Sequence, residues 1–247
     1  QYPLLTFTRV ILFFFGFSSF YVSLTVLPLG TATALFFVTP FLITIFARIF
    51  LKEEIGLRRW SAVVVGFIGV YVTLNPDFSN FNYLSLLPIL CAFCYSLSMI
   101  IIKKTSDKDS VYTQTFTFYI GAIILSIIFY FVIGDGQYNT SNHPASQFIF
   151  REWFIDFNSN ILLMTATGVT ATIAFFFLFT AYSIASPSVV SPFEYSILFW
   201  SPLIGWLYFD EIPSLNTAIG ILIIVSSGIY IFMREKAQNQ SIATEKP

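Results

Sequence analysis

The feature that most constrains this fold is a series of apolar blocks, each about as long as a bilayer is thick. The blocks lie at residues 5–27, 30–50, 58–75, 83–102, 111–133, 161–184, 189–209 and 215–233. About 20 apolar residues in a helix cross a hydrocarbon core of roughly 30 Å. Continuous runs of Ile, Leu and Phe favour helices over alternating membrane strands, because a helix satisfies its own backbone in lipid. We therefore expect an all-α, polytopic membrane protein folded as a helical bundle.

The composition supports a lipid environment and excludes several other classes. Apolar residues make up 56% of the chain and charged residues only 10%, whereas soluble domains carry about 25% charged residues. The net charge is −1 and no basic patch is interleaved with aromatic residues, so we expect no nucleic-acid partner. The lone histidine, His143, lies in a polar loop, and the Cys91–Cys94 pair lacks further metal ligands. We expect no metal, no cofactor and no disulfide framework.

The positive residues predict an orientation in the membrane. If Arg9 is placed inside and the chain crosses eight times, eleven of the 12 Lys and Arg residues fall on the inner side. Only Arg151 falls in an outer loop, residues 134–160. By the positive-inside rule this predicts a multi-pass protein of a bacterial inner (cell) membrane with a cytoplasmic C-terminus.

An internal repeat runs through the chain. The turn at Glu53 and the turn at Glu211 are 158 residues apart, and the helix-ending glycines Gly69 and Gly228 are 159 apart. Five crossings separate the equivalent helices, so the two copies run in opposite directions. This indicates an inverted-topology repeat, a plan common among secondary transporters.

The repeat predicts the domain organisation. Residues 83–236 form a complete second repeat of five helices, and residues 1–82 form a partial first repeat of three. Eight of an expected ten transmembrane helices are then present, which agrees with a first residue that is Gln and a first block without a signal-peptide cleavage site. The polar tail, residues 237–247, is predicted to be disordered and cytoplasmic.

Short motifs in both repeats resemble a known family. The first repeat carries Thr31-Ala32-Thr33-Ala34, Pro40, Leu51-Lys52-Glu53, Trp60, Gly66 and Gly69, and the second carries the run from Pro187 to Tyr195, Gly205, the run from Phe209 to Pro213, Gly220 and Gly228. This pattern is similar to the EamA domain of the drug/metabolite transporter superfamily, and it covers nearly the whole chain. The second-repeat run also resembles the branch that includes S-adenosylmethionine carriers of alphaproteobacteria. In that branch the position of Glu194 is often Gln, so Glu194 is a departure that affects the charge of the substrate or the coupling.

The resemblance implies a ten-helix permease with both ends in the cytoplasm. It implies a central cavity lined by helices of both repeats, through which small organic solutes move by exchange or proton coupling. In this family the first helix helps to line the cavity, and that helix is one of the two expected before residue 1.

Glu194 is the strongest candidate for a functional residue. It lies within the block 189–209, and acidic residues inside a membrane are functional candidates by default because they are costly to bury. Helical spacing places Ser191, Glu194, Leu198, Ser201 and Gly205 on one small, polar face. Glu194 could pair with a cationic solute or carry a proton. The structural alternatives are a hydrogen bond to a neighbouring helix or extension toward the interface.

Other polar residues within the blocks complete the candidate substrate site. A buried tyrosine hydroxyl needs a partner, which a cavity supplies for Tyr95. Arg9 either marks the membrane interface or lines the cavity. The predicted substrate-binding residues are Glu194, Tyr195, Ser191, Tyr95, Ser98, Tyr21 and Arg9.

Two further features are interpreted structurally. The stripe of Ala62, Gly66, Gly69 and Thr73 predicts close helix packing. Glu53 and Glu211 lie at helix ends, where caps or gates are expected rather than substrate ligands.

The leading hypothesis is a secondary transporter of a small organic metabolite, working by alternating access. A non-transporting membrane receptor or assembly subunit is the alternative. An enzyme is not expected, because no nucleophile with its base and no paired histidines are present, and no phosphate-binding loop of the Walker type occurs. The expected partners are the small-molecule substrate and the lipid bilayer, and a homodimer is left open.

Overall fold

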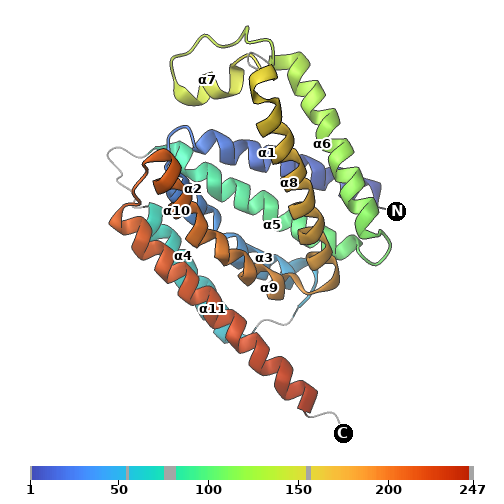
Figure 1. Cartoon of the computed structure of the whole chain (residues 1–247). Coiled ribbons are helices and arrows are strands. Elements are labelled where there is room, and N and C mark those ends of the chain that lie inside the picture. The colour runs from blue at the N-terminus through green and yellow to red at the C-terminus, as the bar shows by residue number, and fades with distance from the viewer. Residues whose placement is uncertain (1, 54–55, 75–81, 154–156, 245–247) are drawn as a thin grey trace.

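The computed structural model describes residues 2–53, 56–74, 82–153 and 157–244. All regular structure in these residues is helical, with no strand (Figure 1). In chain order the elements are α1 (Pro3–Ser23), α2 (Leu29–Phe36), α3 (Thr39–Phe50), α4 (Leu57–Leu74), η1 (Tyr83–Leu86), α5 (Leu87–Thr105), α6 (Val111–Ile133), α7 (Pro144–Phe150), α8 (Phe157–Ile184), α9 (Pro187–Val190), η2 (Ser191–Ser196), α10 (Ile197–Phe209) and α11 (Leu215–Thr244).

Each apolar block contains helical structure, which confirms the expected all-α, polytopic bundle. Five helical segments of the described chain are long and apolar enough to cross a membrane: Pro3–Ser23, Leu29–Phe50, Tyr83–Thr105, Val111–Ile133 and Asn160–Ile184. The apolar parts of α4 and α11 are shorter, Trp60–Leu74 and Leu215–Tyr230. The predicted number of membrane crossings, eight of an expected ten, stays a prediction.

Two of the blocks are broken near a proline. Block 30–50 divides into α2 and α3 at a turn over Phe37 and Val38, just before Pro40. Block 189–209 divides into α9, the 3₁₀ helix η2 and α10, and a proline lies in the first turn of η2. Proline has no backbone N–H to donate to the preceding turn, so a regular helix is interrupted at such a residue. We call α2–α3 and α9–η2–α10 the two composite helices.

The closest helix packing joins the last helices of the two predicted repeats, α4 and α11, which lie side by side (Figure 1). A Cβ atom at Gly69 would lie 3.1 Å from the carbonyl oxygen of Gly220, so neither position has room for a side chain. Gly66 faces the ring of Phe41, and Ala62 and Thr73 are buried. The predicted packing role of the small-residue stripe is confirmed.

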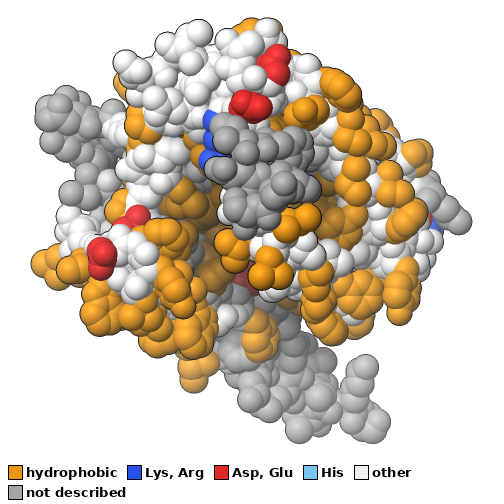
Figure 2. Space-filling view, turned by 45° about the horizontal axis from the view of Figure 1, so that its top comes forward, with side chains coloured by type: hydrophobic (Ala, Val, Ile, Leu, Met, Phe, Trp, Pro, Cys, Tyr) orange, Lys and Arg blue, Asp and Glu red, His pale blue; other side chains and the backbone are white. Residues whose placement is uncertain are grey.

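Apolar side chains also cover much of the outside of the bundle. Figure 2 shows broad hydrophobic areas and few charged groups on one face. Helices α6 and α8 contribute strongly exposed residues, including Phe131 at 79% and Leu162 at 78%. Such surfaces are stable against lipid rather than water.

Two local features differ from expectation. The outer loop contains a short helix, α7, whose first free amide, Ala145 N, donates to Nδ1 of His143 at 3.3 Å. The histidine therefore caps a helix. Helix α11 continues to Thr244, into the tail expected to be disordered, while 245–247 lie outside the described residues. Residues 235–238 read Glu-Lys-Ala-Gln, which all have high helix propensity and extend a helix already nucleated by packing.

Candidate functional site: a carboxylate between two tyrosines

The predicted site lies on η2, in the middle of the second composite helix. This element packs against α3, α10 and α11, so it is enclosed by helices of both predicted repeats. A 3₁₀ segment inside a longer helix is often found at a functional position, because it leaves the regular hydrogen-bond pattern. It carries three of the predicted site residues, Ser191, Glu194 and Tyr195.

Glu194 accepts two hydrogen bonds on one carboxylate oxygen. The hydroxyl of Tyr95, from α5, donates to Oε1 over 2.9 Å, and the hydroxyl of Tyr182, from α8, donates over 2.6 Å. Both tyrosines are buried. Hydrogen bonds to a carboxylate are stronger than those between neutral groups, so the two hydroxyls stabilise this acid inside the bundle.

The second oxygen of Glu194 remains available. Within the part of the chain that the structure describes, no hydrogen bond reaches Oε2. A carboxylate oxygen accepts from N–H or O–H donors and attracts cations. The two tyrosines therefore fix the direction of the acid through one oxygen, and the other oxygen has no bonding partner among the described residues.

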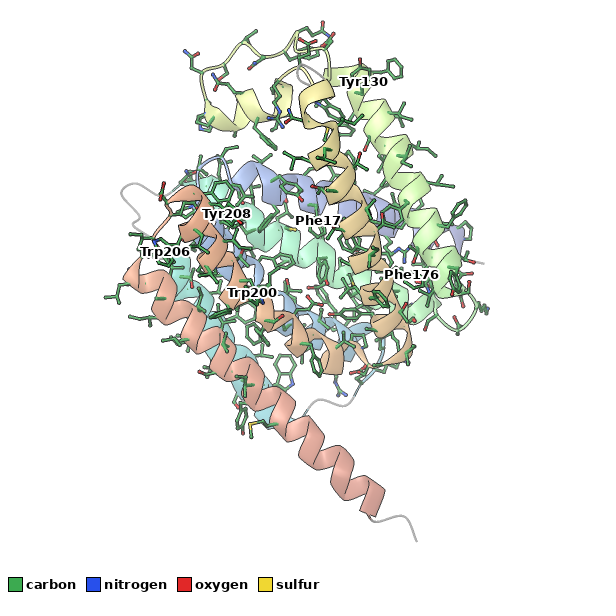
Figure 3. All side chains as sticks on the ribbon, viewed as in Figure 1. Phe17, Tyr130, Phe176, Trp200, Trp206 and Tyr208 are labelled. Atoms are coloured by element: carbon green, nitrogen blue, oxygen red, sulfur yellow. The ribbon has the colours of Figure 1, made fainter. Side chains whose placement is uncertain are left out.

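Aromatic rings surround this group. The ring of Tyr95 lies 5.4 Å from that of Phe36 and 6.3 Å from that of Phe17, measured between ring centroids. Phe17 also packs on Phe175 of α8 at 5.9 Å. In Figure 3, Phe17 lies among the side chains between α1 and α8, whereas Trp200 projects from α10. Ring faces attract cations, so the surroundings and the carboxylate favour the same kind of solute.

Tyr195 and Ser191 lie in the same element and are buried. The Tyr195 ring packs on Phe37 at 5.6 Å between centroids and lies directly over Gly228, where a Cβ atom would overlap it. Its hydroxyl is buried, and no described residue bonds to it. The Tyr195 hydroxyl is therefore a second polar group that a solute could satisfy.

Ser98 and the two cysteines belong to the interior of α5 rather than to an open site. The Ser98 hydroxyl donates to the carbonyl of Cys94 within the same helix over 2.8 Å. Cys91 and Cys94 are free and buried. Ser98 shares a helix face with Tyr95, but its hydroxyl already donates its hydrogen bond within the helix.

Arg9 lies in a separate polar cluster. It is only 1% exposed, and Nη1 donates to Oε1 of Gln114 over 3.1 Å while Nη2 donates to the Gln114 carbonyl. Its guanidinium also lies 5.2 Å from the centre of the Phe179 ring. These contacts tie α1 to α6 and α8, and none of them involves Glu194.

Tyr21 is also apart from Glu194. It is 53% exposed and lines a pocket of about 380 Å³ between α1, α6, α7 and α8, together with Arg151 and Trp153. The seven predicted residues thus separate into Glu194 with Tyr95, their neighbours Ser191, Tyr195 and Ser98, and the two outlying residues Arg9 and Tyr21.

Tyr182 is the functional candidate that sequence reasoning missed. Its signal was weak but present, since it is a tyrosine near the end of an otherwise apolar block, and a buried hydroxyl needs a partner. The partner, Glu194, is only 12 residues away. Gln114, which binds Arg9, was missed in the same way. Among the described residues, no group of three His, Cys, Asp or Glu side chains could hold a metal ion.

A multi-pass bundle of apolar helices with an acid held among aromatic rings is typical of membrane transport proteins. The chain belongs to the EamA-like transporter family, whose sequence model matches residues 1–75 and 83–233. An S-adenosylmethionine uptake transporter of Rickettsia conorii is 32% identical over 234 residues, 95% of this chain and 73% of that protein. One from Rickettsia prowazekii is 31% identical over 239 residues, 97% of this chain and 75% of that protein.

A third relative is named for a different solute. The riboflavin transporter of Vibrio cholerae is 30% identical over 213 residues, 86% of this chain and 65% of that protein. The family and these relatives support a small-molecule transporter and not an enzyme, in a multi-pass membrane protein. The expected family and the expected class of function are confirmed.

Proposed function

We propose that this protein is a secondary transporter that carries a cationic organic metabolite across a bacterial inner membrane by alternating access. Glu194 is the solute-binding acid, Tyr95 and Tyr182 orient it, and Tyr195 supplies a further hydroxyl. The observation that carries the proposal is the enclosed carboxylate with two tyrosine donors on Oε1 and none from the described residues on Oε2.

The charge of the site favours one relative's solute over the other. S-adenosylmethionine has a positive sulfonium, a positive ammonium and a planar adenine ring, whereas riboflavin is uncharged in its ring system. A carboxylate among aromatic rings stabilises a cation both by direct charge and by ring faces. S-adenosylmethionine is therefore the first solute to test, by exchange or with proton coupling.

The proposed orientation follows the basic residues. The last turn of α3 carries Arg48 and Lys52 follows that helix, and the last turn of α5 carries Lys103 and Lys104. By the positive-inside rule these ends and the C-terminus face the cytoplasm.

Native mass spectrometry of the purified protein distinguishes a monomer from a homodimer.

The test is uptake of labelled solutes by the full-length protein in proteoliposomes. The panel is S-adenosylmethionine, riboflavin, amino acids and nucleosides, with Glu194→Gln compared with Glu152→Gln, whose side chain is exposed in the outer loop. We expect saturable uptake of S-adenosylmethionine or, because the resembling S-adenosylmethionine branch often has Gln at this position, of another cationic solute of the panel. Glu194→Gln should lower kcat/KM for that solute roughly 100-fold, and Glu152→Gln should leave it unchanged. Saturable uptake that Glu194→Gln leaves intact would remove the proposed site. Absence of uptake by folded protein for every solute would favour the receptor or assembly alternative.

A further inference from the structure

The two composite helices end in the same unusual turn. Lys52 has a φ of 58° and Asp210 a φ of 54°, in the left-handed region that residues other than glycine seldom adopt. In each turn the amide of the next residue donates to the carbonyl six residues earlier. The two bonds join Glu53 N to Ala47 O over 3.2 Å and Glu211 N to Gly205 O over 3.1 Å. The turns therefore fix the direction of the glutamates that follow them.

Each glutamate reaches the beginning of the other composite helix. Oε2 of Glu211 accepts a hydrogen bond of 2.6 Å from the backbone N–H of Leu29, the first residue of α2. Oε1 of Glu53 accepts one of 2.7 Å from the hydroxyl of Ser186, the residue before α9. A carboxylate at the start of α2 satisfies an N–H that has no partner within the helix and meets the positive end of the helix dipole.

The two contacts are equivalent in the repeat. Glu53 and Glu211 are 158 residues apart, and so are Pro28 and Ser186, the residues that precede the two composite helices. Each repeat thus supplies one glutamate and one helix start, and each contact joins one repeat to the other.

The contacts lie at opposite ends of the bundle. Helix α2 packs on α10 and α3 packs on α9, so the composite helices run antiparallel. The segment Leu29–Phe50 is long enough to cross a membrane, which places one contact near each membrane face. The two composite helices and the two contacts form a closed loop, and Glu194, on η2 of the second composite helix, lies between the two contacts along that helix.

We propose that the Glu53–Ser186 and Glu211–Leu29 contacts are two latches. Each latch closes one end of the solute path, and during transport one latch opens while the other stays closed. The inference rests on the transport function proposed above and assigns both glutamates as positioning residues. When both latches are closed, the repeats are joined at both faces around Glu194. Opening one latch lets the composite helices separate at that face, with the remaining latch as the pivot.

A purely structural role predicts a different behaviour. If each glutamate only capped a helix, its removal would loosen the bundle generally, and both faces would change together. A latch acts on its own face alone. The two hypotheses are therefore separated by measuring the two ends independently.

The experiment measures distances between spin labels in the full-length protein in lipid nanodiscs, without solute. Cys91 and Cys94 are replaced by Ala, and pairs of cysteines are introduced at exposed positions on different repeats. One pair, Ile49 and Ile184, reports the Glu53 end, and the other, Tyr71 and Tyr208, reports the Glu211 end. The variants are Glu53→Ala and Glu211→Ala, with Glu152→Ala as the control.

We expect Glu211→Ala to lengthen the Tyr71–Tyr208 distance by more than about 2 Å and to leave Ile49–Ile184 unchanged. Glu53→Ala gives the reverse. If a variant alters both pairs alike, or neither, the latch proposal is wrong. Glu53→Gln and Glu211→Gln keep an acceptor without its charge and give smaller shifts of the same kind, which preserves the test if an alanine variant does not fold.

Uptake in the same variants separates this proposal from the transport function. We expect each alanine variant to lower kcat about tenfold and to change KM less than about threefold. If the labels show one-sided opening but the parent protein takes up no solute, the latch proposal stands and the proposed transport function is wrong. If the parent protein takes up solute but the label distances are unchanged in both variants, the transport function stands and the latch proposal is wrong.

Discussion

The two composite helices, Leu29–Phe50 and Pro187–Phe209, end in the same kind of turn, yet they differ near the break in each helix. The position of Glu194 in the second corresponds to Phe36 in the first, at the offset of 158 residues. Both side chains contact Tyr95, Phe36 by its ring and Glu194 by its carboxylate. The next pair, Phe37 and Tyr195, pack directly on one another.

The features that both composite helices share are structural, whereas the feature found in only one of them is chemical. A break, a left-handed end and a cross-repeat glutamate occur in both copies, so the fold uses them twice. The carboxylate occurs once, and a buried acid costs free energy that a phenylalanine does not. We therefore assign the break to the scaffold and propose that the acid acts in solute binding.

The largest effect is expected from removing the charge that distinguishes the second composite helix. Glu194→Gln should lower kcat/KM for uptake roughly 100-fold, because a hydrogen-bonded charge contributes about 1.5–3 kcal/mol and each 1.36 kcal/mol is a factor of ten. The matched variant at the equivalent position, Phe36→Leu, removes one of the surrounding rings but no charge, and should lower kcat/KM only about two- to fivefold, the effect of roughly 0.5–1 kcal/mol. Equal losses in the two variants would mean that packing around Tyr95, and not the charge, matters.

A second prediction concerns the helices that follow the two composite helices. Gly220→Ala places a Cβ atom 2.7 Å from the Gly69 carbonyl oxygen and against Thr73, so α4 and α11 must separate. We expect the free energy of unfolding to fall by about 1–3 kcal/mol, as in other overpacked interfaces. The control is Gly168→Ala in α8, where nothing lies within 4 Å. A thermal midpoint of Gly220→Ala equal to that of the control would contradict the close approach.

The tyrosines that orient the carboxylate should have a smaller effect. Tyr95→Phe and Tyr182→Phe each remove one hydrogen bond to Oε1, and we expect kcat/KM to fall about tenfold for each. Tyr112→Phe is the control, because Tyr112 is 75% exposed. The double variant should lose less than the product of the single losses, because the two hydroxyls share one acceptor. Strict additivity in uptake measurements would argue against a shared carboxylate.

The smallest effect is expected when Tyr195, the residue after Glu194, is changed to the phenylalanine found at the equivalent position of the first composite helix, Phe37. Tyr195→Phe removes a buried hydroxyl that no described residue bonds, so the thermal midpoint should stay level or rise. The apparent KM should rise about fivefold if the solute satisfies that hydroxyl, the effect of roughly 1 kcal/mol. A fall in stability without a change in KM would show that Tyr195 has a structural partner instead.

The amino-acid sequence was enough to predict the class of fold and to single out Glu194 as a candidate residue. Long apolar blocks can only be satisfied as helices in lipid, and the spacing of Glu53 and Glu211 predicts the inverted repeat. Glu194 was identifiable because a single acid in an apolar block has a large free-energy cost that requires an explanation. These inferences depend on composition and periodicity, which are local properties of the chain.

The contacts of those residues, in contrast, depend on the tertiary structure. Tyr182 is one of several tyrosines in the chain, and the fold alone brings its hydroxyl to Oε1 of Glu194. The fold also pairs Arg9 with Gln114 and leaves Tyr21 in an outer pocket, although the sequence pattern predicted both Arg9 and Tyr21 for one site with Glu194. The reciprocal glutamate contacts were beyond prediction for the same reason. A hydrogen bond between residues 182 positions apart, such as Glu211 with Leu29, depends on how helices cross in three dimensions, and helical periodicity contains no information about that crossing.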